Sequence, residues 1–185
     1  VAMRTGGMLA SVDRFDVTIR GRGGHGAMPH LTVDPVIVST YIVSQIQSII
    51  SRELSPSSPA VISVTNINGG TGAYSVIPEY VKFSGTIRAL DQKTREYVIR
   101  RIEEICNLIA SSHSATARCY FAAENDSTVN DARCVTFCSA VASEVVGDHN
   151  VITDYDPCMG GEDFGVFLKH IPGAFVFLGQ ATSDP

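Results

Sequence analysis

The fold of this chain is decided by residues 15–30, which read FDVTIRGRGGHGAMPH. Apolar side chains at positions 15, 17 and 19 alternate with polar ones, which is the period of a half-buried β-strand. A glycine-rich loop follows, and Asp34-Pro35 is typical of a helix N-cap and first helical position. The stretch therefore predicts a strand, a glycine loop and then a helix that runs through Ile50.

Three more strands and one more helix continue the pattern. Alternating apolar residues predict strands at 60–67, 81–90 and 115–122, and helical spacing of apolar residues after Asp91 predicts a second helix. The order β-α-β-β-α-β, with right-handed crossovers, makes a ferredoxin-like, split-βαβ sandwich. We therefore predict an α/β fold class with an α+β domain over residues 12–122. Helices cover one face of such a sheet, and the other face or an edge is available to a partner.

Residues 123–185 have a different pattern. They predict a helix at 131–146 ended by Gly147, a short strand at 151–154, a glycine turn leading into a short helix, and an apolar strand at 174–179. One strand pair does not form a stable sheet alone, so this segment needs further chain. Together with residues 1–11 it is predicted to be part of a second, α/β domain.

The composition excludes several classes of protein. A hydrophobic share of 44% and a charged share of 18% describe a folded globular chain. The net charge is -5, without the basic stripe of a nucleic-acid binder, and no apolar run is long enough to span a membrane.

The five cysteines are odd in number and lack a Cys-x-x-Cys pair, which favours reduced thiols and a cytoplasmic location. Cys134 and Cys138 share a helix face, which we interpret as core packing.

A histidine lies among glycines at residues 23–30. Small residues let the backbone approach another surface closely and leave the imidazole of His25 exposed. One interpretation is that His25 donates a hydrogen bond to a developing oxyanion. The other is a flexible connection with a solvated histidine. A metal pair with His30 is disfavoured, since metal sites normally need three or four converging ligands.

Arg88 is a candidate for binding a substrate carboxylate. It lies on the polar face of the strand at 81–90, and its planar guanidinium can bind two oxygens at once. An exposed sheet arginine is, by pattern alone, more often just solvated.

The loop at 69–78 either shapes a ligand site or is a long hairpin connection. In Gly-Gly-Glu-Asp at 160–163, Glu162 either faces a site or complements a helix N-terminus.

Taken together, these stretches resemble the amidohydrolase branch of the aminoacylase/carboxypeptidase family of two-metal hydrolases. That branch includes N-acyl-amino-acid amidohydrolases, hippurate hydrolases and auxin-conjugate hydrolases. The matching pieces follow the family's order and spacing along essentially the whole chain: FDVTIRGRGGHGAMPH, TVDPV, SVIPEYVKFSGTIRAL, STVND, MGGEDFG and PGAFVFLG. The resemblance implies a protein of roughly twice this length, in which a lid that also mediates homodimerisation interrupts a catalytic domain. Residues 12–122 are then the lid, and 1–11 and 123–185 are catalytic-domain pieces.

The resemblance also implies roles for four residues. His25 matches a lid histidine that stabilises the tetrahedral intermediate, in many members at the active site of the other subunit. Arg88 matches the arginine that binds the substrate carboxylate, and Glu162 matches a segment that borders the substrate pocket. Ser75 stands where the family usually has asparagine before Val-Ile-Pro. Because a hydroxyl has fewer donors and a shorter reach than an amide, Ser75 departs from the family pattern.

The family's metal ligands and water-activating glutamate match no residue of this chain. Three ligand segments are expected before Val1 and a last histidine after Pro185. The expected function is hydrolysis of the amide bond of N-acyl amino acids or small peptide-like substrates by a two-metal enzyme using zinc, manganese, cobalt or nickel. The alternative, for the 185 residues alone, is a dimerisation or binding module that holds no metal and has no chemistry of its own.

Overall fold

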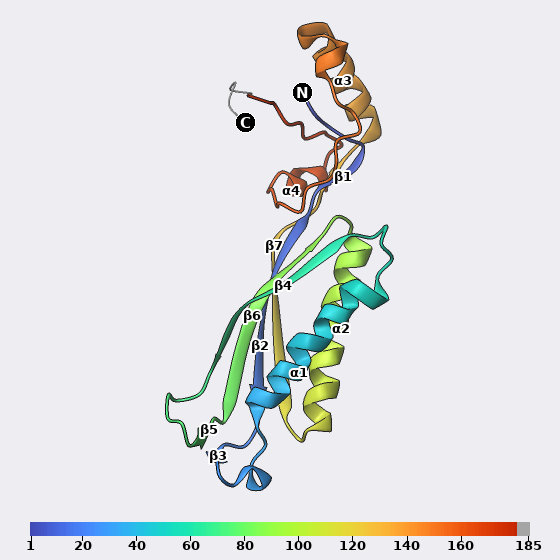
Figure 1. The fold of residues 1–185 in the computed structure, drawn as a ribbon. Coiled ribbons are helices and arrows are strands. Elements are labelled where there is room, and N and C mark those ends of the chain that lie inside the picture. Colours follow the sequence, from blue (N-terminus) through green and yellow to red (C-terminus); the bar gives the residue numbers. More distant parts are fainter. Residues whose placement is uncertain (181–185) are drawn as a thin grey trace. The chain divides into compact units, whose positions relative to one another are not determined.

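The computed structural model describes residues 1–180 and divides into two units (Figure 1). We call Asp13–Arg88 with Lys93–Glu124 the sandwich unit. The flanking unit comprises Val1–Val12, Ala89–Gln92 and the chain from Asn125 onward. The chain passes between the two units after Val12 and after Glu124. Ala89–Gln92 groups with the flanking unit, although it joins a strand and a helix of the sandwich.

The sandwich unit has the predicted element order. Its sheet contains β2 (Ser11–Arg20), β4 (Ala60–Gly69), β6 (Tyr80–Ala89) and β7 (Thr116–Asn125), in the spatial order β4-β6-β2-β7. Helices α1 (Pro35–Ser48) and α2 (Gln92–Ser112) lie on the same face of this sheet (Figure 1). The β-α-β-β-α-β order and the single covered face are therefore confirmed.

The core lies between that face and the two helices. Phe15 of β2 meets Phe83 of β6 edge to face, with ring centroids 6.5 Å apart. Alternation in the strands and helical spacing in the helices bring their apolar positions to one layer, and burying them is the main favourable term in folding. The side chains that fill this layer include Val17, Ile19, Ile42, Ile46, Ile87, Val98, Ile102 and Cys106.

Helix α1 begins as predicted and ends differently. The Asp34 carboxylate accepts a hydrogen bond from the Val36 amide at 2.8 Å, and Pro35 occupies the first turn. Beyond Ser48 the chain continues as a π-helical turn, η2 (Ile49–Glu53), rather than stopping at Ile50. Glu53 accepts hydrogen bonds from Arg101 and Tyr97 of α2, both at 2.8 Å. The Arg101 hydrogen bond lowers the pKa of Glu53, and the turn is thereby tied to α2.

A buried ion pair joins β2 to the start of α2. Arg95 donates to both Asp13 oxygens, from Nε at 2.7 Å and from Nη2 at 2.6 Å. The two side chains are 8% and 2% exposed. Two parallel hydrogen bonds compensate for removing both charges from water, and losing either partner would leave the other charge buried.

The flanking unit is built around a short antiparallel pair that the sequence did not indicate. Strands β1 (Gly6–Leu9) and β8 (Thr128–Asn130) pair with a register shift between Gly7 and Leu9. Helix α3 (Ala132–Val146) has the predicted limits, with Asp131 as N-cap and Gly147 at φ 81° after its end. A 3-10 turn, η3 (Asp148–Asn150), and a four-residue helix, α4 (Gly165–Leu168), follow.

Two strands expected in the flanking unit are absent. Residues 151–154 and 174–179 make only isolated bridges, Ile152 and Phe177 to Ala2 and Asp154 to Arg4. A strand needs a neighbour that runs beside it for several residues, and here the neighbour is the short segment before β1. Among residues 1–180, no helix combines the length and apolar character needed to cross a bilayer.

Candidate active-site elements

His25 lies on a two-stranded ribbon at one end of the sandwich unit. Strand β3 (Gly24–His25) pairs with β5 (Val76–Ile77), so that His25 is opposite Val76. The Gly26 amide donates to the Ser75 carbonyl at 2.7 Å. The structure therefore brings together His25 and Ser75, two candidates that lie 50 positions apart in the sequence. Both are exposed.

The loop that carries His25 is braced on both sides. Arg22, before the loop, and Val33, after the 3-10 turn η1 (Pro29–Leu31), exchange backbone hydrogen bonds of 2.9 Å. Gly21 is needed for this approach, because a Cβ there would lie 2.0 Å from the Val33 carbonyl oxygen. A Cβ on Gly23 would lie 2.7 Å from the carbonyl oxygen of Ile77. The glycines thus permit close backbone packing, which argues against an unstructured connection.

The hydrogen bonding of His25 determines which ring nitrogen carries the proton. The Ala27 amide donates to Nδ1 at 3.1 Å. Since Nδ1 accepts this bond, the neutral imidazole carries its hydrogen on Nε2. His25 is therefore arranged as a hydrogen-bond donor through Nε2, the role that stabilising an oxyanion requires.

Arg88 lies at the opposite end of the sandwich from His25. It is the penultimate residue of β6, half-buried, on the same face as Lys82, Ser84 and Thr86 by strand alternation. The β3–β5 ribbon adjoins the other end of β6, where Glu79 precedes Tyr80. From position 80 to position 88, at about 3.3 Å per residue, β6 extends about 26 Å. One copy of this chain therefore does not place Arg88 and His25 on the same small ligand.

Glu162 belongs to the flanking unit. It is half-buried, and its Oε1 accepts a hydrogen bond from the Asp163 amide at 3.1 Å. Helix α4 begins only at Gly165, has no side-chain cap and has no acidic residue in its first turn. The interpretation of Glu162 as a complement to this helix N-terminus is therefore not supported by its contacts.

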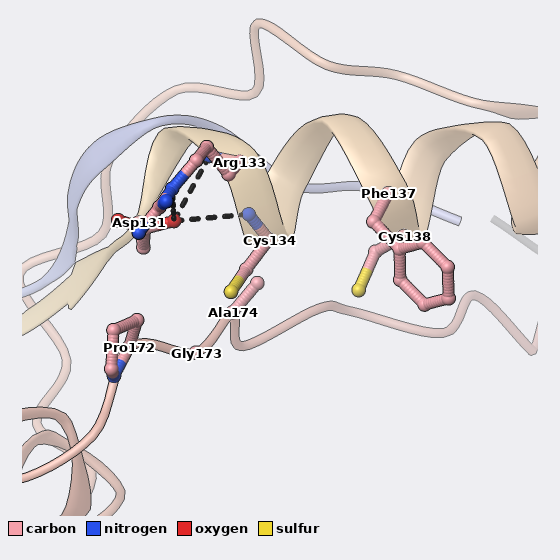
Figure 2. Close-up of a pocket in the computed structure, with 8 residues that line it drawn as sticks. All are labelled: Asp131, Arg133, Cys134, Phe137, Cys138, Pro172, Gly173 and Ala174. Atoms are coloured by element: carbon pink, nitrogen blue, oxygen red, sulfur yellow. Dashed lines mark hydrogen bonds and ion pairs between the residues drawn. The ribbon is translucent and has the colours of Figure 1, made fainter.

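Cys134 and Cys138 line an open pocket of about 450 Å³ in the flanking unit (Figure 2). The pocket lies between the first turns of α3 and the segment Pro172–Ala174 (Figure 2). The expectation of core packing is wrong within the described residues, because both thiols are only half-buried. Desolvation and the Asp131 carboxylate raise the pKa of Cys134. A raised pKa disfavours the nucleophilic thiolate, so the pocket does not have the character of a cysteine active site.

Residues 1–180 contain no group of three or more His, Cys, Asp or Glu side chains placed to hold a metal ion. The donor set of this part of the chain therefore does not fit a two-metal centre.

One pair of charged residues near His25 was missed in the sequence. Arg20 donates from Nε and Nη2 to Oε1 of Glu79, at 3.1 and 2.6 Å. Neither segment by itself indicates that these two charges meet. The residues of one strand do not specify the register that it takes with a distant strand.

Comparison with known proteins identifies relatives along the whole chain. Residues 10–114 match the M20 peptidase dimerisation domain. The chain is 33% identical over 184 residues to N-acetylcysteine deacetylase of Bacillus subtilis (strain 168), covering 100% of this chain and 47% of that protein. It is 34% identical over 176 residues to hippurate hydrolase of Campylobacter jejuni, covering 95% and 46%. The chain thus spans about half the length of the curated relatives it matches.

A solved structure shares the fold. The crystal structure of the YXEP protein of Bacillus subtilis, described as a dinuclear metal binding peptidase from the M20 family, aligns with a TM-score of 0.75 at 26% identity. The alignment covers 95% of this chain and 43% of that one.

Proposed function

The chain belongs to the M20 peptidase family, and from this we propose that the full-length protein hydrolyses the amide bond of N-acyl amino acids or small peptide-like substrates. The relatives named for deacetylation of N-acetylcysteine and hydrolysis of hippurate support this substrate class, since both substrates pair an acyl amide with a free carboxylate. The observation that carries the proposal is the hydrogen-bonded state of His25.

His25 is proposed to stabilise the oxyanion that forms when the amide carbonyl is attacked. The Ala27 amide occupies Nδ1, so Nε2–H is the donor that the imidazole offers. The ribbon holds that donor in place before the reaction, which avoids a reorganisation cost as negative charge develops. Ser75 lies on the strand side of the ribbon opposite His25, where its carbonyl accepts a hydrogen bond from the Gly26 amide. It is proposed to contact the substrate through its hydroxyl.

Arg88 is proposed to bind the substrate carboxylate, and Glu162 to border the substrate pocket. The guanidinium offers two donors to two carboxylate oxygens, which orients the substrate as well as holding it. Because β6 separates Arg88 from the His25 ribbon by about 26 Å, we propose that the two act together only across a homodimer formed through the sandwich unit. His25 of one copy then serves the site that contains Arg88 of its partner.

The full-length enzyme is proposed to contain two divalent metal ions, zinc, manganese, cobalt or nickel. Bound divalent metals supply hydroxide and polarise a carbonyl in such hydrolases, and a dinuclear relative supports their presence here. Their ligands are proposed to lie outside residues 1–180, which lack a suitable cluster.

We also propose a cytoplasmic location, supported by five unpaired cysteines.

A second function is favoured for the 185 residues by themselves. The match to a peptidase dimerisation domain covers more than half of the chain, and the described residues lack a metal cluster. We propose that this portion alone is a dimerisation and substrate-binding module without turnover. Release of amino acid by the isolated 185 residues would contradict this.

The proposal is tested with the full-length protein and a panel of N-acyl amino acids. Replacing His25 by alanine removes the Nε2 donor, and we expect kcat to fall about 100- to 1,000-fold, with a much smaller change in KM. The matched control is His113→Ala, since that imidazole stacks on Tyr41 at 5.3 Å between the helices and has no assigned part in the reaction. Equal kcat values for wild type and His25→Ala would remove the assigned role.

A further inference from the structure

The ion pair between Arg20 and Glu79 lies where the His25 ribbon leaves the sheet. Arg20 is the last residue of β2, and Glu79 lies between β5 and β6. The side-chain contact is accompanied by a backbone one, in which the Gly21 amide donates to the Glu79 carbonyl at 2.9 Å. The pair therefore joins the two segments from which β3 and β5 depart.

The ribbon itself is too short to be stable on its own. It contains two residue pairs, Gly24 with Ile77 and His25 with Val76. Isolated two-stranded ribbons are marginal even at greater length, and short exposed segments open with free energies near zero. A modest contact at the base of such a ribbon has a large effect on how often it is closed, although it adds little to the stability of the whole fold.

We propose that the Arg20–Glu79 ion pair is a positioning device for His25. By holding the end of β2 against the turn before β6, it keeps β3 paired with β5 and so keeps His25 opposite Val76. The two side chains are 67% and 57% exposed, so the pair acts through its location rather than through its strength. The inference rests on the proposed function, since it assigns to Arg20 and Glu79 a part in the chemistry of His25.

The same strand provides a matched control. Near the other end of β2, Arg14 forms an ion pair of 2.6 Å with Glu124 of β7. It has the same residue types and comparable exposure, 62% and 39%, but no ribbon departs from it. Any general effect of removing a surface arginine from β2 should therefore appear in both variants, whereas an effect on the ribbon should appear only at Arg20.

The first test is amide hydrogen exchange at Gly26, whose N–H bonds to the Ser75 carbonyl. In Arg20→Ala and in Glu79→Gln we expect this amide to exchange about 1.5- to 1.7-fold faster, because losing an exposed ion pair raises the open fraction of a ribbon that opens with a free energy near zero from about one half to about three quarters or more. Arg14→Ala should leave the rate unchanged, and the swapped double variant Arg20→Glu/Glu79→Arg should restore slow exchange. Equal exchange rates in Arg20→Ala and Arg14→Ala would overturn the proposal.

The second test is kinetic and uses the full-length protein. We expect Arg20→Ala to lower kcat about two- to three-fold at unchanged KM, in proportion to the closed ribbon that is lost, and to have no further effect when His25 is already alanine. A loss that persists in the His25→Ala background would overturn positioning through His25. If His25→Ala itself retained full turnover, the proposed function would fail, whereas Gly26 exchange would still decide whether the ion pair holds the ribbon.

Discussion

Arg88 and Lys82 share one face of β6, and comparing them isolates the role proposed for the arginine. Replacing Arg88 by alanine removes a charge-assisted, two-oxygen contact with the substrate carboxylate. Such bonds contribute about 1.5–3 kcal/mol, so we expect KM to rise about ten- to one-hundred-fold, with a smaller change in kcat. Steady-state kinetics of the full-length protein on an N-acyl amino acid measure this.

The control for Arg88 uses both a second variant and a second substrate. Lys82→Ala removes a positive charge from the same strand and should leave KM nearly unchanged. A substrate whose carboxylate is blocked as an amide should have the same KM in wild type and Arg88→Ala, because the contact is already absent. An unchanged KM for the free carboxylate in Arg88→Ala would count against the assignment.

At the scale of elements, the Asp13–Arg95 pair links β2 to α2 and is the strongest candidate for a single contact whose loss disrupts packing. Arg95→Met leaves the Asp13 carboxylate 2% exposed and without this partner. We expect the free energy of unfolding to fall by about 3–5 kcal/mol, as observed when one member of a buried ion pair is removed. Urea denaturation of the variant and the wild type measures the difference.

The buried pair is distinguished from surface charges by two further variants. Arg100→Met removes an exposed pair with Glu104, at 3.8 Å, and should change stability by less than about 0.5 kcal/mol. The double variant Asp13→Leu/Arg95→Met should recover most of the loss, because no buried charge remains. If Arg95→Met were no more destabilising than Arg100→Met, the Asp13–Arg95 contact would not be important for the fold.

At the scale of the whole molecule, the separation of His25 from Arg88 predicts that activity depends on two copies. His25→Ala and Arg88→Ala protein, each poorly active alone, should complement when they are unfolded together and refolded, or co-expressed. One site of each mixed dimer then combines an intact Arg88 with the partner's intact His25. We expect recovery of up to about a quarter of wild-type activity, since half of randomly formed dimers are mixed and each has one intact site.

Complementation is interpreted against a control mixture. Combining His25→Ala with a second preparation of His25→Ala at the same total concentration should give no recovery. An absence of recovery in the mixed sample, with mixed dimers demonstrated by mass spectrometry, would place His25 and Arg88 at the same copy's site or at unrelated sites.

Much of the fold could be predicted from local patterns. The alternation at 15–20 predicted β2, Asp34-Pro35 predicted the start of α1, and the order of four strands and two helices was confirmed. The six matching stretches predicted the family, and the comparisons confirm it. These features were predictable because period, capping and motif spacing are properties of neighbouring residues.

The candidate site could be predicted only as separate residues. The sequence by itself determined that His25 lies in a glycine-rich loop and Arg88 on a polar strand face. Only the tertiary structure decided that β3 pairs with β5 and that Arg20 meets Glu79. It also decided that Arg88 lies at the far end of β6. The physical reason is that backbone hydrogen bonds and exposed ion pairs form between groups that almost every segment carries, so their partners depend on where the chain returns in space.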